Sequence, residues 1–338
     1  MVSAHLSKSE VSDKQGLESR FVIYVRKGSS PLRTKTGYIN QQGDVVIPPL
    51  FDDGLNFREG LAAVKKNKKW GFIDATGTFV IPPQFDAYAR FHDGLASMYS
   101  RRKQGFIDTS GNFVIEPKYD SVGSFYEGLA AVSRDGKWGF VDRHGTEGIP
   151  VVHEDVREFS EGLAAVMRNG AWGYIDHFGE FIIAPQFRGE EGKAAGRWTA
   201  GLAVVPAGDK FGFINRQAEM VIPPNFLIAG RFSEGLVDVK TVQESWGYID
   251  QIGQFVIPPI FRYAQSFSCG LAKVGVEHRY GFINRLGNLV LPLEFWEAES
   301  FESGLCYVST EEEVGYINLQ GQYVWRGTFV EGRKGSLR

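Results

Sequence analysis

The chain of 338 residues is poor in cysteine, histidine and methionine, and it contains no long apolar run. Its two cysteines, Cys269 and Cys306, are too few for a disulfide framework and favour a reducing compartment. Residues 1–10 lack the apolar stretch of a signal peptide, and no run of about 18 apolar residues occurs elsewhere. We therefore expect a soluble, cytoplasmic protein that does not insert into a membrane.

An excess of charge of one sign is also missing. The chain has 37 basic and 40 acidic residues and a formal net charge of −3, which gives no global reason to expect nucleic acid or an anionic membrane as partner. Catalytic signatures are missing too, since the six histidines are scattered and neither a Gly-x-Ser-x-Gly motif nor a phosphate-binding loop occurs. We expect no enzymatic activity, no cofactor and no metal site.

Glycine and phenylalanine are abundant, with 41 and 26 residues, and the glycines recur at a fixed interval. The stretch 69–85, KWGFIDATGTFVIPPQF, is repeated with variation through most of the chain. The glycine of its Trp-Gly pair has equivalents that are mostly 34 residues apart, at Gly37, Gly71, Gly105, Gly139, Gly173, Gly212, Gly247, Gly281 and Gly315. Such a period indicates stacked supersecondary units, so we expect one continuous array and not two or three separate domains.

The repeated pattern, Lys-Trp-Gly-Phe-Ile-Asp followed by a glycine and by Ile-Pro-Pro-x-Phe, resembles the WG-containing (KWG-type) β-repeat family over roughly residues 20 to 326. The resemblance implies a tandem β-repeat scaffold with no general catalytic activity. We assign residues 20–334 to a single array of nine repeats. The polar segment 1–19 is expected to be disordered, and residues 335–338 to be a frayed end.

One repeat contains three strand signals, and the segment 84–91 is compatible with a short fourth strand. Asp74 to Gly77 is expected to be a hairpin turn, because the aspartate can accept a backbone hydrogen bond and glycine supplies a positive φ. Calcium binding is the alternative, but the dense acidic spacing of calcium loops is missing. Pro82 and Pro83 are expected to end the third strand, since proline cannot donate to a β ladder.

The expected fold is all-β, with nine antiparallel β-meander units arranged as a propeller-like toroid. The strands are apolar on nearly every residue, so both faces should be covered, and a glycine inside a strand should mark close approach by a neighbouring sheet. An open β-superhelix, or solenoid, is the alternative, because propellers typically have four to eight blades. The last hairpin tip, residues 311–313, is acidic and the first tips are basic, so a closed ring would join opposite charges. Head-to-tail self-association would also join them.

Basic residues crowd the hairpin tips that precede the early Trp-Gly positions. They are either solvated tips or a track for an acidic partner, and without exposed aromatic residues among them or a nucleic-acid motif we do not expect a nucleic-acid site. The row consists of Lys65, Lys66, Lys68, Lys69, Arg101, Arg102 and Lys103. A second recurring feature is an acidic residue before five of the Gly-Leu pairs, expected to serve the turn, with an acidic ring lining the array as the alternative. It occurs at Glu59, Asp93, Glu127, Glu161 and Glu234.

The repeat is violated at two places. Glu147 and His153 stand where the fourth unit should have aromatic residues, and the fifth unit has five extra residues between Phe187 and Trp198. Loops at such violations often carry binding groups, so we expect the two to be neighbours in space and to form a binding patch, with drift at a surface loop as the alternative. The candidate residues are His153, Glu154, Asp155, Arg188, Glu190, Glu191, Lys193, Arg197 and Trp198.

From the sequence, the favoured function is a non-catalytic scaffold or adaptor that binds a protein partner, of unknown identity, through its loop face. A binding module for a glycan or another small ligand is the alternative, with Trp198, Tyr88 and Trp296 as candidate stacking residues. An enzyme is the least favoured reading, since no pair of carboxylates recurs where acid–base chemistry would need it.

Overall fold

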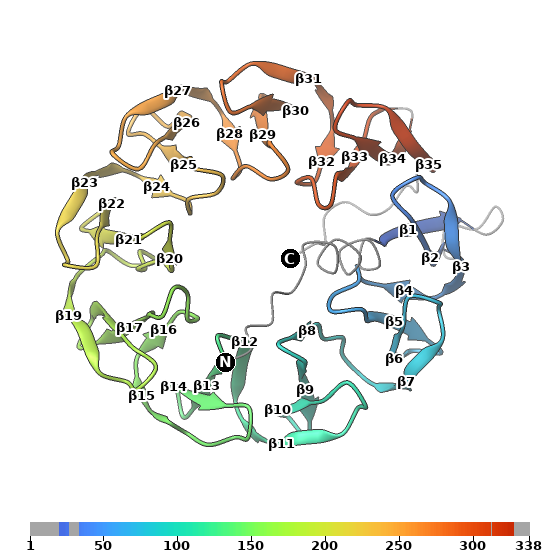
Figure 1. The fold of residues 1–338 in the computed structure, drawn as a ribbon, viewed down its shortest axis with the longest axis horizontal. Coiled ribbons are helices and arrows are strands. Elements are labelled where there is room, and N and C mark those ends of the chain that lie inside the picture. Colours follow the sequence, from blue (N-terminus) through green and yellow to red (C-terminus); the bar gives the residue numbers. More distant parts are fainter. Residues whose placement is uncertain (1–19, 27–33, 312, 328–338) are drawn as a thin grey trace, which may run out of the picture.

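The computed structural model describes residues 20–26, 34–311 and 313–327, and every regular element in them is a β-strand. Nine small antiparallel sheets follow one another around a closed ring, like the blades of a propeller (Figure 1). The toroid is thereby confirmed, and the open superhelix is wrong because the last sheet packs against the first. The segments expected to be disordered or frayed, 1–19 and 335–338, lie outside the described residues.

We number the blades in chain order. From blade 2 on, each blade has four strands, the first nearest the centre of the ring and the fourth at its rim (Figure 1). Blade 1 contains β1 (Phe21–Arg26), β2 (Thr34–Ile39) and β3 (Val45–Phe51). Blade 2 contains β4 (Asp53–Gly54), β5 (Ala62–Lys66), β6 (Lys69–Ile73) and β7 (Phe79–Phe85), and blade 3 contains β8 (Phe91–His92), β9 (Leu95–Ser100), β10 (Lys103–Ile107) and β11 (Phe113–Tyr119). Blade 4 contains β12 (Ser121–Tyr126), β13 (Leu129–Arg134), β14 (Lys137–Asp142) and β15 (Ile149–His153), and blade 5 contains β16 (Asp155–Val156), β17 (Ala164–Arg168), β18 (Ala171–Ile175) and β19 (Phe181–Phe187). Blade 6 contains β20 (Trp198–Thr199), β21 (Leu202–Ala207), β22 (Lys210–Ile214) and β23 (Met220–Phe226), and blade 7 contains β24 (Ile228–Ala229), β25 (Val237–Lys240), β26 (Trp246–Ile249) and β27 (Phe255–Phe261). Blade 8 contains β28 (Tyr263–Ala264), β29 (Leu271–Val276), β30 (Arg279–Asn284) and β31 (Leu289–Phe295), and blade 9 contains β32 (Glu297–Ala298), β33 (Leu305–Ser309), β34 (Val314–Asn318) and β35 (Tyr323–Gly327).

Outer strand β7 continues through Pro82 and Pro83, so the expectation that these prolines end the strand is wrong. Proline is tolerated because β7 is an edge strand, whose outward N–H groups have no partner strand. Between two regular pairs of the ladder, Gly71 alone faces residues 82–84, and the prolines therefore lie in a β-bulge. The bulge bends the outer strand over the middle of its own sheet.

Gly71 is required by this bulge. A Cβ atom on it would lie 2.5 Å from the carbonyl oxygen of Ile81, a distance that real Cβ atoms do not adopt. The equivalent glycines meet the outer strand of their own blade in the same way, for example Gly139 at 2.6 Å from the Ile149 oxygen. The close approach therefore comes from within the blade, and the expectation that it comes from a neighbouring sheet is wrong.

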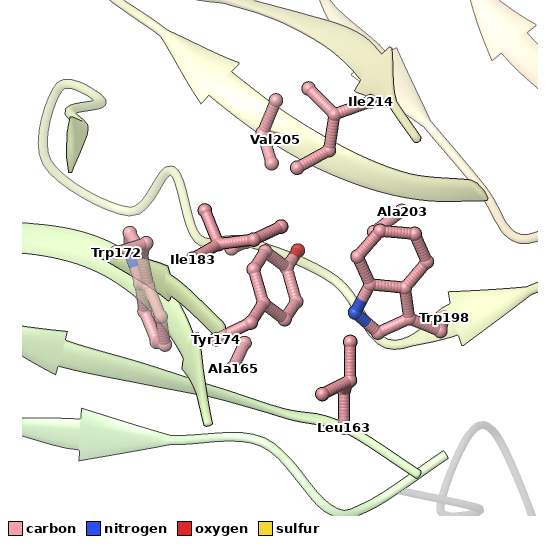
Figure 2. Packing of buried hydrophobic residues seen from close by; sticks show 10 residues of the cluster. Leu163, Ala165, Trp172, Tyr174, Ile183, Trp198, Ala203, Val205 and Ile214 are labelled. Carbon is pink, nitrogen blue, oxygen red and sulfur yellow. The ribbon is translucent and has the colours of Figure 1, made fainter. Parts of the chain in front are cut away.

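The hydrophobic core is divided into clusters that lie between consecutive blades. Figure 2 shows the cluster between blades 5 and 6, in which Tyr174 and Trp198 meet edge to face with ring centroids 5.2 Å apart. The ring is closed by a cluster of the same kind between blades 1 and 9, where Phe21 and Tyr316 pack at 5.4 Å. The Tyr316 hydroxyl also donates to the carbonyl oxygen of Val22 at 2.9 Å. Each blade thus buries its apolar face only against its neighbours.

The turn between the third and fourth strands has the expected chemistry. In blade 2, Oδ1 of Asp74 accepts from the N–H groups of Thr76 and Thr78 at 2.9 and 3.1 Å, and Gly77 has a φ of 89°. The equivalent side chains accept in the same manner in the other blades, at Asn40, Asp108, Asp142, Asp176, Asn215, Asp250, Asn284 and Asn318. The row of Asp and Asn residues is a row of turn acceptors.

The antiparallel order gives the ring two distinct faces. We call the face with the hairpins between second and third strands, and with the linkers between blades, the tip face. We call the opposite face, with the inner turns between first and second strands and the outer turns between third and fourth strands, the turn face. Over the described residues, no helix has the length and apolar character that crossing a bilayer requires.

Candidate functional site

Glu147 belongs to a polar seam between blades 3 and 4. At the regular seam between blades 1 and 2, Phe51 and Phe79 meet edge to face with centroids 5.8 Å apart. Between blades 3 and 4 the same two places hold Tyr119 and Glu147, and the tyrosine hydroxyl donates to the carboxylate at 3.0 Å. Arg134 donates to the same carboxylate oxygen. An aromatic pair has thus been replaced by a matched polar group.

This polar seam controls the charge of its members. Burial by itself would raise the pKa of Glu147, but the hydrogen bonds from Arg134 and Tyr119 outweigh burial and hold that pKa below its usual value. Burial and the adjacent carboxylate raise the pKa of Tyr119. The carboxylate is therefore ionised at neutral pH and engaged by its neighbours, as in a structural ion pair.

His153 lies inside the seam between blades 4 and 5. Its side chain is buried, its ring stands edge-on to Phe181 at 6.5 Å, and it pairs across the ladder with Trp138. Its Nδ1 atom is buried and has no hydrogen-bond partner among the described residues. Burial, and then the charge of Arg168, lower the pKa of the imidazole, so it is neutral at pH 7.

Glu154 and Arg188 hold the hairpin tip of blade 5 from two sides. The carboxylate of Glu154 accepts from the N–H groups of Asn169 and Gly170 at 2.9 Å each. The Arg188 guanidinium donates to the carbonyl oxygen of Asn169 at 3.0 Å. Glu154 follows His153 and Arg188 begins the inserted segment, so residues beside the two violations of the repeat converge on one turn, which their contacts cap.

The inserted segment folds back on blade 6. The N–H group of Glu190 donates to the carbonyl oxygen of Gly208 at 3.0 Å, whereas the side chains of Glu190 and Glu191 are exposed. The Lys193 ammonium donates to the carbonyl oxygen of Leu227 at 2.7 Å, which ties the insertion to the linker before blade 7. This stretch is a surface loop with its own internal support.

Asp155 and Arg197 each pair with charged groups next to them. Asp155 accepts from Arg157 at 3.0 Å. The Arg197 guanidinium lies 3.8 Å from the carboxylate of Glu158 and 5.1 Å from the centroid of the Tyr126 ring. These residues lie on or next to the inner strands of blades 4 to 6, away from the hairpin tip that Glu154 and Arg188 hold.

Trp198 is fully buried in the cluster of Figure 2 and offers no surface to a sugar ring. It stands where Phe91 stands in blade 3, on the innermost strand, and it is therefore part of the core. Tyr88 and Trp296 are each 51% exposed, but they lie in the linkers before blades 3 and 9. The three stacking residues of the glycan alternative therefore do not form one site.

The acidic residues before the Gly-Leu pairs link the inner turns of successive blades. Glu59 has a φ of 50°, and its carboxylate accepts from the N–H groups of Asp93 and Gly94 in the next blade at 2.7 and 2.8 Å. Glu127 and Glu161 repeat the contact with the blades that follow them. These carboxylates serve the turns, as expected from the sequence.

The basic tip row divides into paired and free side chains. Lys69 pairs with Asp86, and Lys103 pairs with Asp120 in the same way. The ammonium groups of Lys65 and Lys66 lie 5.7 Å from the centroids of the Trp70 and Phe79 rings. The remaining members are exposed and have no ion pair or hydrogen bond from their side chains within the described residues: Lys68, Arg101 and Arg102.

The tips of blades 2 and 3 also have strained backbones. Lys68 and Arg102 have φ values of 67° and 68°, and Arg101 has a φ of 49°. The position of Arg102 holds glycine in the next two blades, at Gly136 and Gly170. Non-glycine residues are disfavoured there, because their Cβ atom crowds the backbone. Lys68 and Arg102 thus stand at positions where glycine would cause less backbone strain.

The acidic tip of blade 9 pairs locally. Glu311 lies 3.0 Å from Arg279 of blade 8, and Glu313 lies 3.2 Å from Arg326 of its own blade. From the sequence, this acidic tip was expected to lie beside the first basic tip in a closed ring. Residues 27–33 of that first tip lie outside the described residues. The ring closes through the apolar cluster between blades 1 and 9, whatever those charges contribute.

Apolar side chains at the outer turns are the feature that sequence reasoning missed. The second residue after the turn Asp or Asn is apolar and highly exposed at Phe178 (84%), Ile252 (67%) and Leu286 (77%). The same place holds polar residues in the other six blades, at Gln42, Thr76, Ser110, His144, Gln217 and Gln320. Aligning this one position across the nine repeats would have revealed the contrast.

Among the described residues, no group of three or more His, Cys, Asp or Glu side chains is arranged to hold a metal ion. His177, the histidine nearest to Phe178, stacks on Phe159 with centroids 4.5 Å apart and lies 3.2 Å from the carboxylate of Glu127.

Comparison with known proteins identifies the repeat. The family model described as WG containing repeat matches eight segments, at residues 37–70, 70–98, 105–138, 138–170, 172–210, 211–241, 246–277 and 280–312. A comparison with curated proteins found no match. Among solved structures, one described as a eukaryotic initiation factor superposes with a TM-score of 0.66 at 14% identity, and the alignment covers 93% of this chain and 96% of that one. BamB from Moraxella catarrhalis gives a TM-score of 0.46 at 13% identity, with coverage of 72% and 87%.

The structural similarity at these identities concerns the fold alone. The family matches begin at Gly37 and continue to residue 312, which is most of the ring. The ninth glycine, Gly315, lies on β34 and faces the outer strand β35 as its equivalents do. The chain therefore belongs to the WG-containing repeat family.

Proposed function

We propose that the protein is a non-catalytic scaffold that holds a partner protein on the turn face of blades 5 to 8. Repeat propellers in general act as interaction scaffolds, and function has to be argued from a site on them. The observation that carries the proposal is the exposure of Phe178, Ile252 and Leu286 at the outer turns. Exposed apolar groups that gather on one side of a soluble protein are typical of binding surfaces.

The fold itself does not need apolar residues at these positions. The residue just before two of them ties the turn to the preceding blade, through the pair of His177 with Glu127 and the hydrogen bond from Gln251 to the carbonyl oxygen of Ala200. The next side chain is then directed to solvent, and six blades place a polar group there. The three apolar residues are therefore free for a partner.

The surface continues on to the outer strands of blades 6 to 8. Exposed apolar side chains there are Met220, Val221, Phe255, Val256, Leu289 and Val290. Glu180 and Glu219, both exposed, follow the outer turns of blades 5 and 6. A fitting partner is a protein segment that presents apolar side chains flanked by lysine or arginine, because such a segment complements both features.

The test replaces the three apolar residues by the residue that blade 2 uses, in the triple variant Phe178→Thr, Ile252→Thr and Leu286→Thr. The control changes polar turns outside the proposed surface, with Thr76→Ser, Ser110→Thr and Gln42→Asn. Both proteins and the wild type are cross-linked in lysate, and the partners are identified and then purified for binding assays.

We expect a purified partner that binds the wild type and the control with equal affinity and the triple variant at least tenfold more weakly. Equal binding to all three proteins would contradict the proposal, as would the lack of any partner. Sedimentation velocity of the three proteins alone distinguishes a second copy of the chain from a different partner.

A further inference from the structure

The tip face of blades 2 and 3 has the properties of a second binding surface, on the opposite face from the proposed protein site. We propose that this surface binds single-stranded nucleic acid, with its cations on the phosphates and its tyrosines on the bases. We call it the basic tip surface, and it consists of Lys65, Lys66, Lys68, Arg101, Arg102, Tyr88 and Tyr99.

The cations of this surface are not neutralised by the protein. Asp86 and Asp120, on the same face, are engaged by Lys69 and Lys103. The side chains of Lys68, Arg101 and Arg102 remain exposed and without an acidic partner in the described part of the chain. Several free cations on adjacent hairpin tips form a local positive surface on a chain whose net charge is −3.

The backbone of the tips indicates that these cations have a function. A two-residue turn with positive φ at both positions favours Asn-Gly or Asp-Gly, and blades 4 and 5 use such pairs. Blade 3 places Arg101 and Arg102 there at φ values of 49° and 68°. Within the described part of the chain, the two exposed side chains make no hydrogen bond or ion pair that would offset this strain, and strained positions of this kind cluster at ligand sites.

Two exposed tyrosines stand among the cations. Tyr99 is 54% exposed and precedes Arg101 by two residues on β9. Tyr88 is 51% exposed and stands edge-on to Trp70 at 5.3 Å, and the Lys65 ammonium lies 5.7 Å from the same indole. Aromatic faces beside cations stack bases while the cations contact the phosphates.

This composition favours single-stranded nucleic acid over an acidic protein segment. An acidic segment would need the cations but would gain little from exposed tyrosine rings. The sequence alone argued against nucleic acid because it revealed neither exposed aromatic residues among the tip cations nor a nucleic-acid motif. The exposures of Tyr88 and Tyr99 remove the first objection, and binding through stacking and phosphate contacts needs no sequence motif.

The experiment uses the full chain and fluorescein-labelled 20-nucleotide oligo-dT and oligo-U, with anisotropy measured between 50 and 200 mM salt. The charge variant is Arg101→Asn with Arg102→Gly, which installs the turn residues favoured at these φ values and is therefore expected to fold. The ring variant is Tyr99→Ala, with Tyr99→Phe as the variant that keeps the stacking face. Arg262→Ala, an exposed arginine on the tip face before blade 8, is the control for the loss of a cation elsewhere on that face. Labelled polyglutamate is the acidic-protein probe.

We expect oligonucleotide binding that weakens with salt, with a slope of log K against log salt that becomes shallower by about 1 to 1.5 in the charge variant. Tyr99→Ala should weaken binding roughly tenfold, and Tyr99→Phe and Arg262→Ala should leave it unchanged. Failure of both oligonucleotides to bind overturns the proposal. Polyglutamate binding that is as tight, and that ignores Tyr99→Ala, overturns it in favour of an acidic protein. Neither result affects the partner site on the turn face.

Discussion

Blade 2 and blade 4 have the same four-strand plan but contact the preceding blade with different chemistry. Blade 2 offers Phe79 to Phe51 of blade 1, and the two rings meet edge to face. Blade 4 offers Glu147 to Tyr119 of blade 3, and a hydrogen bond replaces the ring contact. The seam of a repeat protein thus tolerates a polar residue when the facing residue changes with it, because a buried polar group needs a partner.

The difference also changes how the candidate patch is understood. Glu147 and His153 resembled functional residues because ionisable groups had replaced aromatics. In the structure, Glu147 is satisfied by two donors, and His153 is buried with a neutral ring. Residues that break a repeat pattern can therefore be part of its packing, and the exposed surfaces had to be found by comparing side-chain exposure between blades.

The largest expected effect tests what blades 2 and 4 share. Gly71→Ala and Gly139→Ala should each lower the free energy of unfolding by about 3 kcal/mol, because the new Cβ meets a backbone carbonyl oxygen that cannot move away. The measurement is urea unfolding followed by circular dichroism. Gly148→Ala, where the added Cβ has open space, is the control and should change stability by less than about 0.5 kcal/mol. A mild effect at both strand glycines would show that the bulge can shift.

The next effect breaks the polar seam of blade 4. Glu147→Ala should cost about 2 kcal/mol, since it leaves the buried Tyr119 hydroxyl without its acceptor, whereas the Arg134 guanidinium is exposed enough to regain water. Combining Glu147→Phe with Tyr119→Phe rebuilds the seam of blade 2 and should recover most of that loss. A double-mutant cycle of the two phenylalanine substitutions measures the coupling, and simple additivity would contradict the matched pair.

The same residue gives a pH dependence with a defined sign. The pKa of Glu147 is lower in the folded than in the unfolded protein, so its contribution to stability is present above the unfolded pKa and is lost as the pH falls through the folded one. The difference in unfolding free energy between the wild type and Glu147→Ala should therefore shrink in acid. A difference that stays constant from pH 7 to pH 3 would contradict this.

A smaller effect comes from the other exceptional residue of blade 4. His153→Phe restores the residue type of Phe85 and removes a buried nitrogen without a partner, so it should raise stability by about 1 kcal/mol at pH 7. The pKa of His153 is lower in the folded protein, so the unfolded state takes up the proton first and the wild type loses stability as the pH falls below about 6.5. The advantage of the variant should grow between pH 8 and pH 5, and urea titrations at both pH values measure it. A variant less stable than the wild type would show that the site does not fit phenylalanine.

The smallest effect compares the tips of blades 3 and 4. Arg101→Asn with Arg102→Gly should raise the unfolding free energy by about 0.5 to 1 kcal/mol, because it gives the tip of blade 3 a turn like Asp135-Gly136 of blade 4. The reciprocal change Gly136→Arg should cost a similar amount. Thermal unfolding of both variants measures the two shifts. Equal stability of the wild type and both variants would show that the backbone of the blade 3 tip is not strained, which would weaken the case for the basic tip surface as a binding site.

Much of the ring could be predicted because the residue pattern within each repeat indicates where its strands and turns lie. The Asp74 turn, the fourth strand and the nine-unit array follow from spacing and residue type. The role of Pro82 was mispredicted, since a bulge at an edge strand cannot be distinguished from a strand end without the ladder. In the candidate patch, Glu154 and Arg188 contact the same hairpin tip, which they cap, and Trp198 is buried.

The sequence by itself determined the number of blades, the apolar strands and the turn chemistry, because these depend on local backbone preferences and on a period repeated nine times. Ring closure was decided by tertiary structure, since it depends on how slightly rotated neighbours accumulate until blade 9 packs on Phe21 of blade 1. Tertiary structure also decided which side chains are exposed to solvent. Whether Phe178, Tyr99 or His153 faces solvent depends on which blade lies beside it, and one repeat read alone contains no information about its neighbour.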